Sequence, residues 1–180
     1  MKNLLYFIAG DTGEWRVDAI STVVGDGVAA AARLARSEAP APTGAVWTLA
    51  GTSSNVRYAT RRDLTALRAV QQGLGRPQAT RAALIPIRKS PAWWELAQDE
   101  RMAIFHHQSR HNAIGLEYLP GVARQLIHCR DHGGDFDFLT WFEYAPEDAD
   151  GFEALVARLR ETPEWRFVDR EVDIRLSRAA

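Results

Sequence analysis

The stretch VARQLIHCRDHGGDFDFLTWFEY, residues 122–144, decides the fold of this chain. Its two ends, 122–129 and 136–144, are rich in β-branched, aromatic and other apolar residues, which predicts two strands. The residues between them, RDHGGD at 130–135, contain adjacent glycines and polar side chains, which is typical of a turn. The stretch therefore predicts an antiparallel hairpin.

Helices and further strands flank this hairpin on both sides. The expected elements are a strand at 82–87, a helix at 91–110, a helix at 147–160 and a strand at 165–176. Ser90 and Pro91 suit the cap and first turn of the earlier helix, and Pro146 opens the later one. The resulting order, β-α-β-β-α-β, is that of the ferredoxin-like fold.

The first half of the chain repeats part of that order. Strands are expected at 4–9, 15–24 and 45–51, with 54–60 as a candidate fourth, a Pro- and Ala-rich loop at 36–44 and a helix at 61–73. We therefore expect an α+β protein of two ferredoxin-like halves, 1–80 and 81–180. The first half is trimmed of one helix. Together the halves would form one antiparallel sheet or barrel with helices on one side.

Composition narrows the class of protein. The chain has 180 residues, with 22 basic and 23 acidic side chains and a formal net charge of −1, which argues against a dedicated nucleic-acid binder. Its one cysteine, Cys129, excludes an internal disulfide framework and a Cys-rich zinc site. The apolar run at 4–9 is short and is broken at once by GDTGE, so we expect neither a signal peptide nor a membrane span, and a cytoplasmic location.

Five histidines lie between residues 106 and 132, and His111 is the one that suggests a site. His107 and His111 share a helical face, but the HExxH pattern of zinc proteases is absent. His106, His107 and His132 are expected on the solvent face. His111 is expected where the helix ends, aimed at a cavity, from which one imidazole can ligate a haem iron. A lone histidine is nevertheless more often structural.

Arg124 and the pair Trp93-Trp94 are the other candidates. Along its strand Arg124 shares a face with Val122 and Leu126, so its charge is expected beside apolar neighbours. Such a guanidinium needs an acceptor, either a carboxylate on a neighbouring strand or a small bound anion. The two tryptophans point about 100° apart on a helix, so one can join the core while the other lines a cavity.

At this point the sequence resembles the chlorite dismutase family, in its short-chain, dimeric form. The resemblance is carried by IPIRKSPAWW at 85–94, HNAIGLEYLPGVARQLIHCRD at 111–131, FDFLTWFEYAP at 136–146 and EWRFVDREVDIRLSR at 164–178. Weaker similarity extends it to 53–61 and 74–86. These are long blocks, so they are far more specific than a short motif.

The resemblance implies a role for each candidate residue. His111 would be the proximal haem ligand, 13 residues before the distal arginine, Arg124. Glu164 would be the carboxylate that accepts a hydrogen bond from the ligand imidazole. The remaining matches are Lys89, Trp93 and Trp94, expected to hold the haem propionates and line the pocket, Tyr58, expected to contact a propionate, and Gln71, expected to partner Arg124.

The resemblance also implies a function. It is the conversion of chlorite to chloride and dioxygen at a b-type haem by a homodimer, with the small anion held by Arg124. Three alternatives remain open on the sequence: a coproheme decarboxylase, a haem peroxidase of the same superfamily, and a haem-free ferredoxin-like binding protein. The short length and Arg124 count against the decarboxylase.

Overall fold

A computed structural model describes residues 4–53 and 60–179. The strands are β1 Leu4–Gly10, β2 Trp15–Val24, β3 Arg33–Ser37, β4 Trp47–Ser53, β5 Arg81–Lys89, β6 Val122–His128, β7 Phe138–Tyr144 and β8 Val168–Ser177. The helices are α1 Arg61–Val70, α2 Pro91–Glu95, α3 Gln98–Met102, α4 His111–Glu117 and α5 Ala149–Arg160. A π-helical segment, η1 Ala103–Gln108, and three 3₁₀ segments, η2 Arg130–His132, η3 Pro146–Asp148 and η4 Pro163–Phe167, complete the set.

All eight strands belong to one closed antiparallel sheet. Its order is β1-β3-β2-β8-β5-β7-β6-β4, and β4 pairs with β1 to close it. The sheet joins early and late parts of the chain, because β2 pairs with β8 and β4 pairs with β6. The expectation of an α+β protein with one antiparallel sheet and helices beside it is confirmed.

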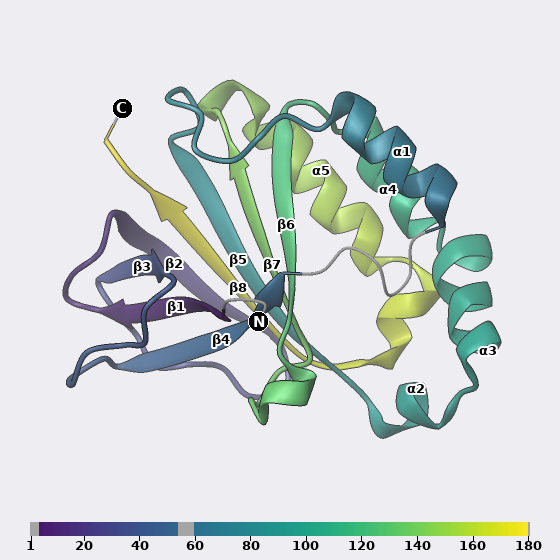
Figure 1. Ribbon diagram of the computed structural model, residues 1–180, viewed down its shortest axis with the longest axis horizontal. Coiled ribbons are helices and arrows are strands. Elements are labelled where there is room, and N and C mark those ends of the chain that lie inside the picture. Colours follow the sequence, from purple (N-terminus) through teal and green to yellow (C-terminus); the bar gives the residue numbers. More distant parts are fainter. Residues whose placement is uncertain (1–3, 54–59, 180) are drawn as a thin grey trace.

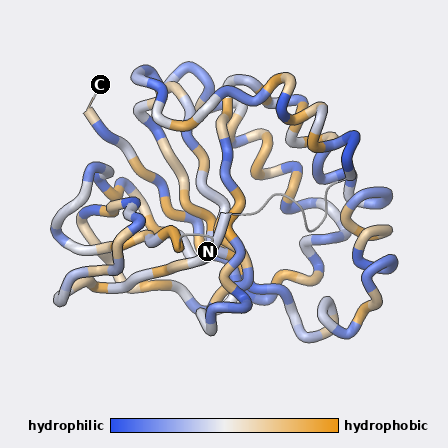
Figure 2. Tube along the Cα trace, viewed as in Figure 1, coloured by the Kyte–Doolittle hydropathy of each residue, from blue (hydrophilic) through white to orange (hydrophobic). Residues whose placement is uncertain are grey.

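The two faces of this sheet bury different cores. Side chains such as Leu84, Trp141 and Ile174 fill the interior of the closed sheet, whereas Ile85 and Phe142 point out toward the helices. Neighbouring residues of one strand reach opposite faces because side chains alternate along it. Figure 1 shows the helices gathered on one outer side, and Figure 2 shows hydrophobic residues concentrated along the strands near the middle of the molecule.

The closure of the sheet depends on a glycine. Within the described residues, β4 and β6 share the pairs Thr52–His128 and Ser53–Ile127. A Cβ on Gly51 would lie 2.3 Å from the main-chain oxygen of His128. Only a residue without a side chain permits this approach.

The hairpin and the later elements were predicted well. β6 and β7 pair from Val122–Tyr144 to His128–Phe138, and α5 and β8 follow in the expected order. Residues 165–167, expected in the last strand, belong instead to η4. The candidate strand at 54–60 falls almost wholly outside the described residues, except for Thr60, which caps α1.

Strand β3 was not predicted, and part of it was assigned to a loop. Its sequence, RLARS, has no β-branched residue and only Leu34 is buried. The segment is a strand because β1 and β2 pair with it on its two sides. Tertiary pairing therefore outweighs its weak local preference.

The expected helix at 91–110 was wrong as a single element. It is divided into α2, α3 and η1, with extended backbone at Leu96 and Ala97. The Glu100 carboxylate accepts a hydrogen bond from the Ala97 main-chain nitrogen at 2.7 Å, and so begins a new helix there. This start signal, an acidic residue three positions after the cap, is present in the sequence.

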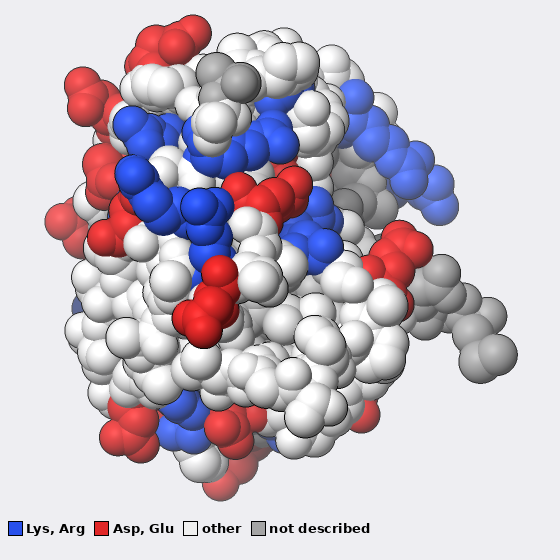
Figure 3. All heavy atoms as spheres, turned by 90° about the vertical axis from the view of Figure 1, so that its left-hand side faces the viewer, with Lys and Arg blue, Asp and Glu red and all other residues white. Residues whose placement is uncertain are grey.

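Positively and negatively charged side chains are mixed on the face of the molecule that Figure 3 shows. Figure 3 shows the side at the left of Figure 1: basic and acidic side chains intermingle in its upper part, a broad uncharged area crosses its middle, and side chains of both signs reappear along its lower edge. On this face there is no continuous basic surface of the kind that binds a polyanion. Among residues 4–53 and 60–179, no helix has the length and apolar character needed to cross a bilayer.

Candidate active site

A large cavity lies between the outer face of β5, β6 and β7 and the helices α1, α4 and α5. It encloses about 1100 Å³ of empty space, counted out to its open mouth. Most of its wall is apolar, and the side chains include Leu67, Ile85, Phe138, Phe142, Leu155 and Val156. A pocket with such a wall suits a mainly apolar ligand that is held in place by a few polar side chains.

His111 lines this cavity from the first residue of α4, not from the end of a helix as expected. The reversal occurs at Arg110, whose φ of 50° is left-handed and rare for a side chain other than glycine. That kink ends the preceding π-helical segment and starts α4. As a result, the imidazole projects from a helix start into the cavity.

The imidazole of His111 is held by Glu164. His111 Nδ1 lies 2.8 Å from Glu164 Oε2. Because an ionised carboxylate only accepts hydrogen bonds, Nδ1 carries the proton and donates it. In the neutral imidazole the other ring nitrogen, Nε2, carries no proton and is available to a ligand in the cavity that His111 lines.

Glu164 is buried and paired a second time, with Lys89. Lys89 Nζ donates to Glu164 Oε1 at 2.7 Å, and the two residues are each 3% exposed. Burial would raise the pKa of Glu164, but the Lys89 ammonium and the His111 imidazole together lower it to about 2. Glu164 is therefore a permanent anion behind the imidazole, which makes Nε2 a stronger electron donor.

Three further residues support this group, and sequence reasoning missed them. The Glu164 main-chain nitrogen donates to Ser109 Oγ at 2.9 Å. The rings of Phe105 and Trp165 lie nearly parallel to His111, with centroids 4.5 and 6.3 Å away. Trp165 directly follows Glu164 in the sequence, but nothing local signals that its ring packs against His111.

Arg124 enters the same cavity from β6. Its face assignment was confirmed, since Val122 and Leu126 pack toward the helices beside it. Within the described part of the chain, Arg124 Nε is buried and has no hydrogen-bond partner. Burial lowers the pKa of the guanidinium, and no carboxylate contributes to that pKa. Of the two alternatives, the described residues supply no carboxylate partner for Arg124, which leaves a small bound anion as the other candidate acceptor.

Gln71 lies beside Arg124 but makes a contact different from the expected one. It follows α1, and its Nε2 donates to the Arg124 main-chain carbonyl at 2.8 Å. The contact fixes the backbone of β6 at Arg124 rather than the guanidinium. Tyr58 lies outside the described residues.

Lys89, Trp93 and Trp94 are placed differently from the expectation. Lys89 was expected to hold a haem carboxylate, but its ammonium is bound to Glu164 and lies 4.5 Å from the Trp93 ring centroid. Trp93 is fully buried, whereas Trp94 is half-buried, so one tryptophan joins the core as predicted. Trp94 Nε1 donates to Asp137 at 3.3 Å, outside the main cavity.

The other histidines take no part in the cavity. His107 and His132 are exposed, as expected, whereas His106 is half-buried and its Nε2 lies 3.3 Å from Asp63 Oδ2. Lys89, Glu164 and His111 come from β5, η4 and α4, and the fold alone brings them together.

Fold and cavity together define a class: an α+β protein with a closed antiparallel sheet and a mainly apolar pocket, lined by a carboxylate-bound imidazole and by an arginine whose Nε has no partner among the described residues. The sequence model of the chlorite dismutase family matches residues 14–180. The chain therefore belongs to the chlorite dismutase family.

Individual relatives agree with this assignment. The structure of the dimeric chlorite dismutases from Nitrobacter winogradskyi is 56% identical, with a TM-score of 0.90, and the match covers 97% of this chain and 99% of that one. The chlorite dismutase from Candidatus Nitrospira defluvii in complex with imidazole is 28% identical, with a TM-score of 0.59, over 80% of this chain and 56% of that one.

A third relative matches in one part only. The chlorite dismutase of Ideonella dechloratans is 31% identical over 86 residues, which are 48% of this chain and 28% of the Ideonella protein. The match thus spans less than a third of that relative's length.

Proposed function

We propose that this protein binds a b-type haem in the cavity, where His111 Nε2 would hold the iron, and converts chlorite to chloride and dioxygen. The observation that carries the proposal is that Arg124, whose Nε has no acceptor among the described residues, and the carboxylate-bound imidazole of His111 line one mainly apolar cavity. The family membership of the chain supports it.

The residues present fit a haem. The unprotonated Nε2 of His111 suits iron, and the phenyl and aliphatic side chains of the wall suit the porphyrin faces. The wall also contains few groups that a strong oxidant would attack first, since its side chains are mainly Leu, Ile, Val and Phe. Bound there, haem iron would supply the redox chemistry that takes an oxygen atom from chlorite.

The protein's own residues would bind and hold the anion. One chlorite ion gives one chloride and one dioxygen, so two Cl–O bonds break, one O–O bond forms, and no proton or external electron is consumed. The Arg124 side of the cavity therefore needs no general acid or base. It needs a fixed positive charge, which a guanidinium keeps near neutral pH.

Arg124 would act twice in this scheme. Its charge first draws chlorite into a mainly apolar cavity, where attraction between charges is stronger than in water. It then holds the chlorine oxyanion close until both oxygens have left chlorine. Gln71, by binding the Arg124 carbonyl, would keep that stretch of β6 in place.

Glu164 and Lys89 would act on the other side. The Glu164 carboxylate keeps the proton on His111 Nδ1 and makes the imidazole electron-rich, which favours oxidised iron. Lys89 holds Glu164 in its ionised form. Trp93 would contribute through the packing of Lys89, since the two are in cation–π contact.

We also infer the finer architecture and the assembly. The order β5, helices, β6, β7, α5, β8 supports a ferredoxin-like half at 81–180, and the strands before α1 support a trimmed half at 1–80. A homodimer is proposed because the similar Nitrobacter protein is described as dimeric. Size-exclusion chromatography with light scattering tests it, and a monomeric mass would overturn it.

One experiment tests the function directly. Haem-loaded protein is mixed with chlorite in a Clark electrode, and dioxygen is expected in a one-to-one ratio to the chlorite consumed. Haem binding without dioxygen would reject the reaction and keep the haem site; coproporphyrin iron and peroxide would then be tested as substrates. Failure to bind haem at all would reject both.

A further inference from the structure

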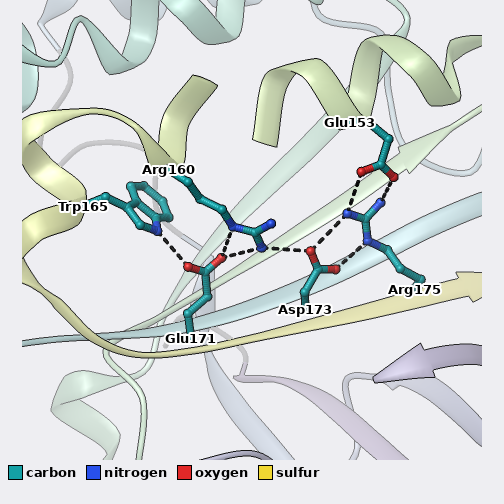
Figure 4. A network of polar contacts seen from close by, with 6 residues as sticks. All are labelled: Glu153, Arg160, Trp165, Glu171, Asp173 and Arg175. Atoms are coloured by element: carbon teal, nitrogen blue, oxygen red, sulfur yellow. Dashed lines mark hydrogen bonds and ion pairs between the residues drawn. The ribbon is translucent and has the colours of Figure 1, made fainter. Parts of the chain in front are cut away.

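A network of polar contacts with two buried carboxylates at its centre connects α5, η4 and β8 beside the cavity. Figure 4 shows its members: Glu153, Arg160, Trp165, Glu171, Asp173 and Arg175. Glu171 and Asp173 share the helix-facing side of β8, two residues apart, and they are 0% and 5% exposed. Of these two carboxylates, only Glu171 also lines the cavity.

The two carboxylates have one partner in common and otherwise differ. Arg160 donates to Glu171 Oε1 through Nε and Nη2, at 2.8 and 2.6 Å, and to Asp173 Oδ2 through Nη2, at 2.8 Å. Asp173 also accepts hydrogen bonds from Arg175 Nε and Nη2, at 2.5 and 3.0 Å. The other oxygen of Glu171, Oε2, accepts a hydrogen bond from Trp165 Nε1 at 2.7 Å. The network thus has a structural arm through Asp173 and an arm that reaches Trp165.

Trp165 lies against two members of the His111 group. Its ring is 25° from parallel to the imidazole, with centroids 6.3 Å apart, and the Lys89 ammonium lies 5.5 Å from its centroid. An indole can rotate about its two side-chain torsions unless its N–H is fixed. Here one buried oxygen, Glu171 Oε2, fixes it.

We propose that Glu171 is a positioning residue which, through its hydrogen bond to Trp165, sets the plane of the His111 imidazole in the cavity. Among the described residues, Glu171 has no hydrogen bond to His111, so its effect on His111 passes through Trp165. The inference deepens the proposed function, because it rests on His111 being the ligand of the bound group. A small rotation of the ligand plane alters its bonding to the metal, which is how residues beyond the ligands tune a metal site.

The test compares Glu171→Gln with a matched control, Asp173→Asn. A glutamine at 171 has one acceptor oxygen and one donor amide, so it cannot accept from Arg160 and Trp165 at once. Asp173→Asn disturbs the same Arg160 and the same strand but leaves the Trp165 contact. Trp165→Phe keeps a ring and removes the N–H, so it should act like Glu171→Gln.

The first measurement uses the haem-free full chain. Proton NMR gives the Trp165 indole N–H signal, assigned by its loss in Trp165→Phe, and the contacts between the Trp165 and His111 rings. In Glu171→Gln we expect an upfield shift of that signal and weakened ring–ring contacts, with both unchanged in Asp173→Asn. Unchanged ring–ring contacts in Glu171→Gln would overturn the proposal, whether or not the protein binds haem.

The second measurement uses the ferrous, haem-loaded protein. The iron–imidazole stretching band in resonance Raman spectra should shift in Glu171→Gln and Trp165→Phe, show no additional shift in the double variant, and stay in place in Asp173→Asn. A shift of similar size in Asp173→Asn would reduce Glu171 to a structural role. This band does not require chlorite turnover, so failure of the proposed reaction would leave the outcome readable.

Discussion

Lys89 and Glu164 form a buried ion pair behind the cavity: Lys89 Nζ lies 2.7 Å from Glu164 Oε1, and the two side chains are 2% and 4% exposed. β5 supplies the cation and η4 the anion, from 75 residues apart in the chain. His111 Nδ1 hydrogen-bonds the other oxygen of the Glu164 carboxylate, Oε2. A charge so deeply buried is tolerated only while its partner is present.

Removing the cation should therefore destabilise the fold strongly. Lys89→Met leaves the Glu164 charge buried with one partner, and we expect a loss of about 3–5 kcal/mol in the free energy of unfolding. Arg88→Met is the matched control, because the Arg88–Asp169 pair is 44% and 35% exposed and worth about 0–1 kcal/mol. Urea unfolding of the haem-free proteins measures both. Equal losses in the two variants would contradict the assigned burial.

Stability should also fall in acid because of Glu164. Its pKa is lowered from an ordinary 4.5 to about 2 in the folded protein, so ionisation favours the folded state above pH 4.5. That stabilisation, about 3 kcal/mol at most, is lost as pH falls from 4.5 toward 2. Glu164→Gln should show a flatter decline of unfolding free energy over this range. A decline as steep as that of the unmodified protein would place the acid sensitivity elsewhere.

Loss of the unpaired guanidinium should affect turnover but not haem binding. Arg124→Ala removes the only charge proposed to hold the anion, and we expect dioxygen evolution to fall by roughly 10²-fold. Gln125→Ala is the control, since Gln125 lies next to Arg124 on β6 but hydrogen-bonds Arg36 and Ser53 on the opposite face. The Soret absorbance should be retained in both. Normal turnover in Arg124→Ala would remove that residue from the mechanism.

Loss of the proposed ligand should affect haem binding itself. His111→Ala removes the imidazole that Glu164 holds in the cavity, so we expect weak or no haem uptake and no dioxygen. The control is His107→Ala, four residues earlier on the chain and exposed. Haem titration followed at the Soret band compares them. An unchanged ferric spectrum in His111→Ala would refute the assignment of His111 as the iron ligand.

The close approach of β4 to β6 at Gly51 gives a prediction about the stability of the fold. Gly51→Ala places a Cβ 2.3 Å from the His128 carbonyl oxygen, so the strands must separate, at a cost of about 1–3 kcal/mol. Gly134→Ala is the control, because a Cβ there meets nothing within 4 Å. Thermal unfolding of the two variants checks this. A Gly51→Ala protein as stable as the control would mean that the closure tolerates a wider gap.

The sequence by itself determined the elements whose signals are local. Alternation and turn residues predict the β6–β7 hairpin, the helix after Pro146 and the face that Arg124 shares with Val122 and Leu126. The resemblance to known proteins pointed to His111, Arg124 and Glu164. In each case the evidence lies within a few residues of the feature or within one long block.

Only the tertiary structure decided how these residues meet. β3 forms because β1 and β2 pair with it on its two sides. His111 begins a helix because Arg110 adopts a left-handed backbone conformation. The Lys89 ammonium is bound to the Glu164 carboxylate. Buried charges choose partners by distance in space, which sequence spacing does not encode. For the same reason Glu171 and Trp165 carried no local signal, and their contact is defined only once β8 and η4 pack beside the cavity.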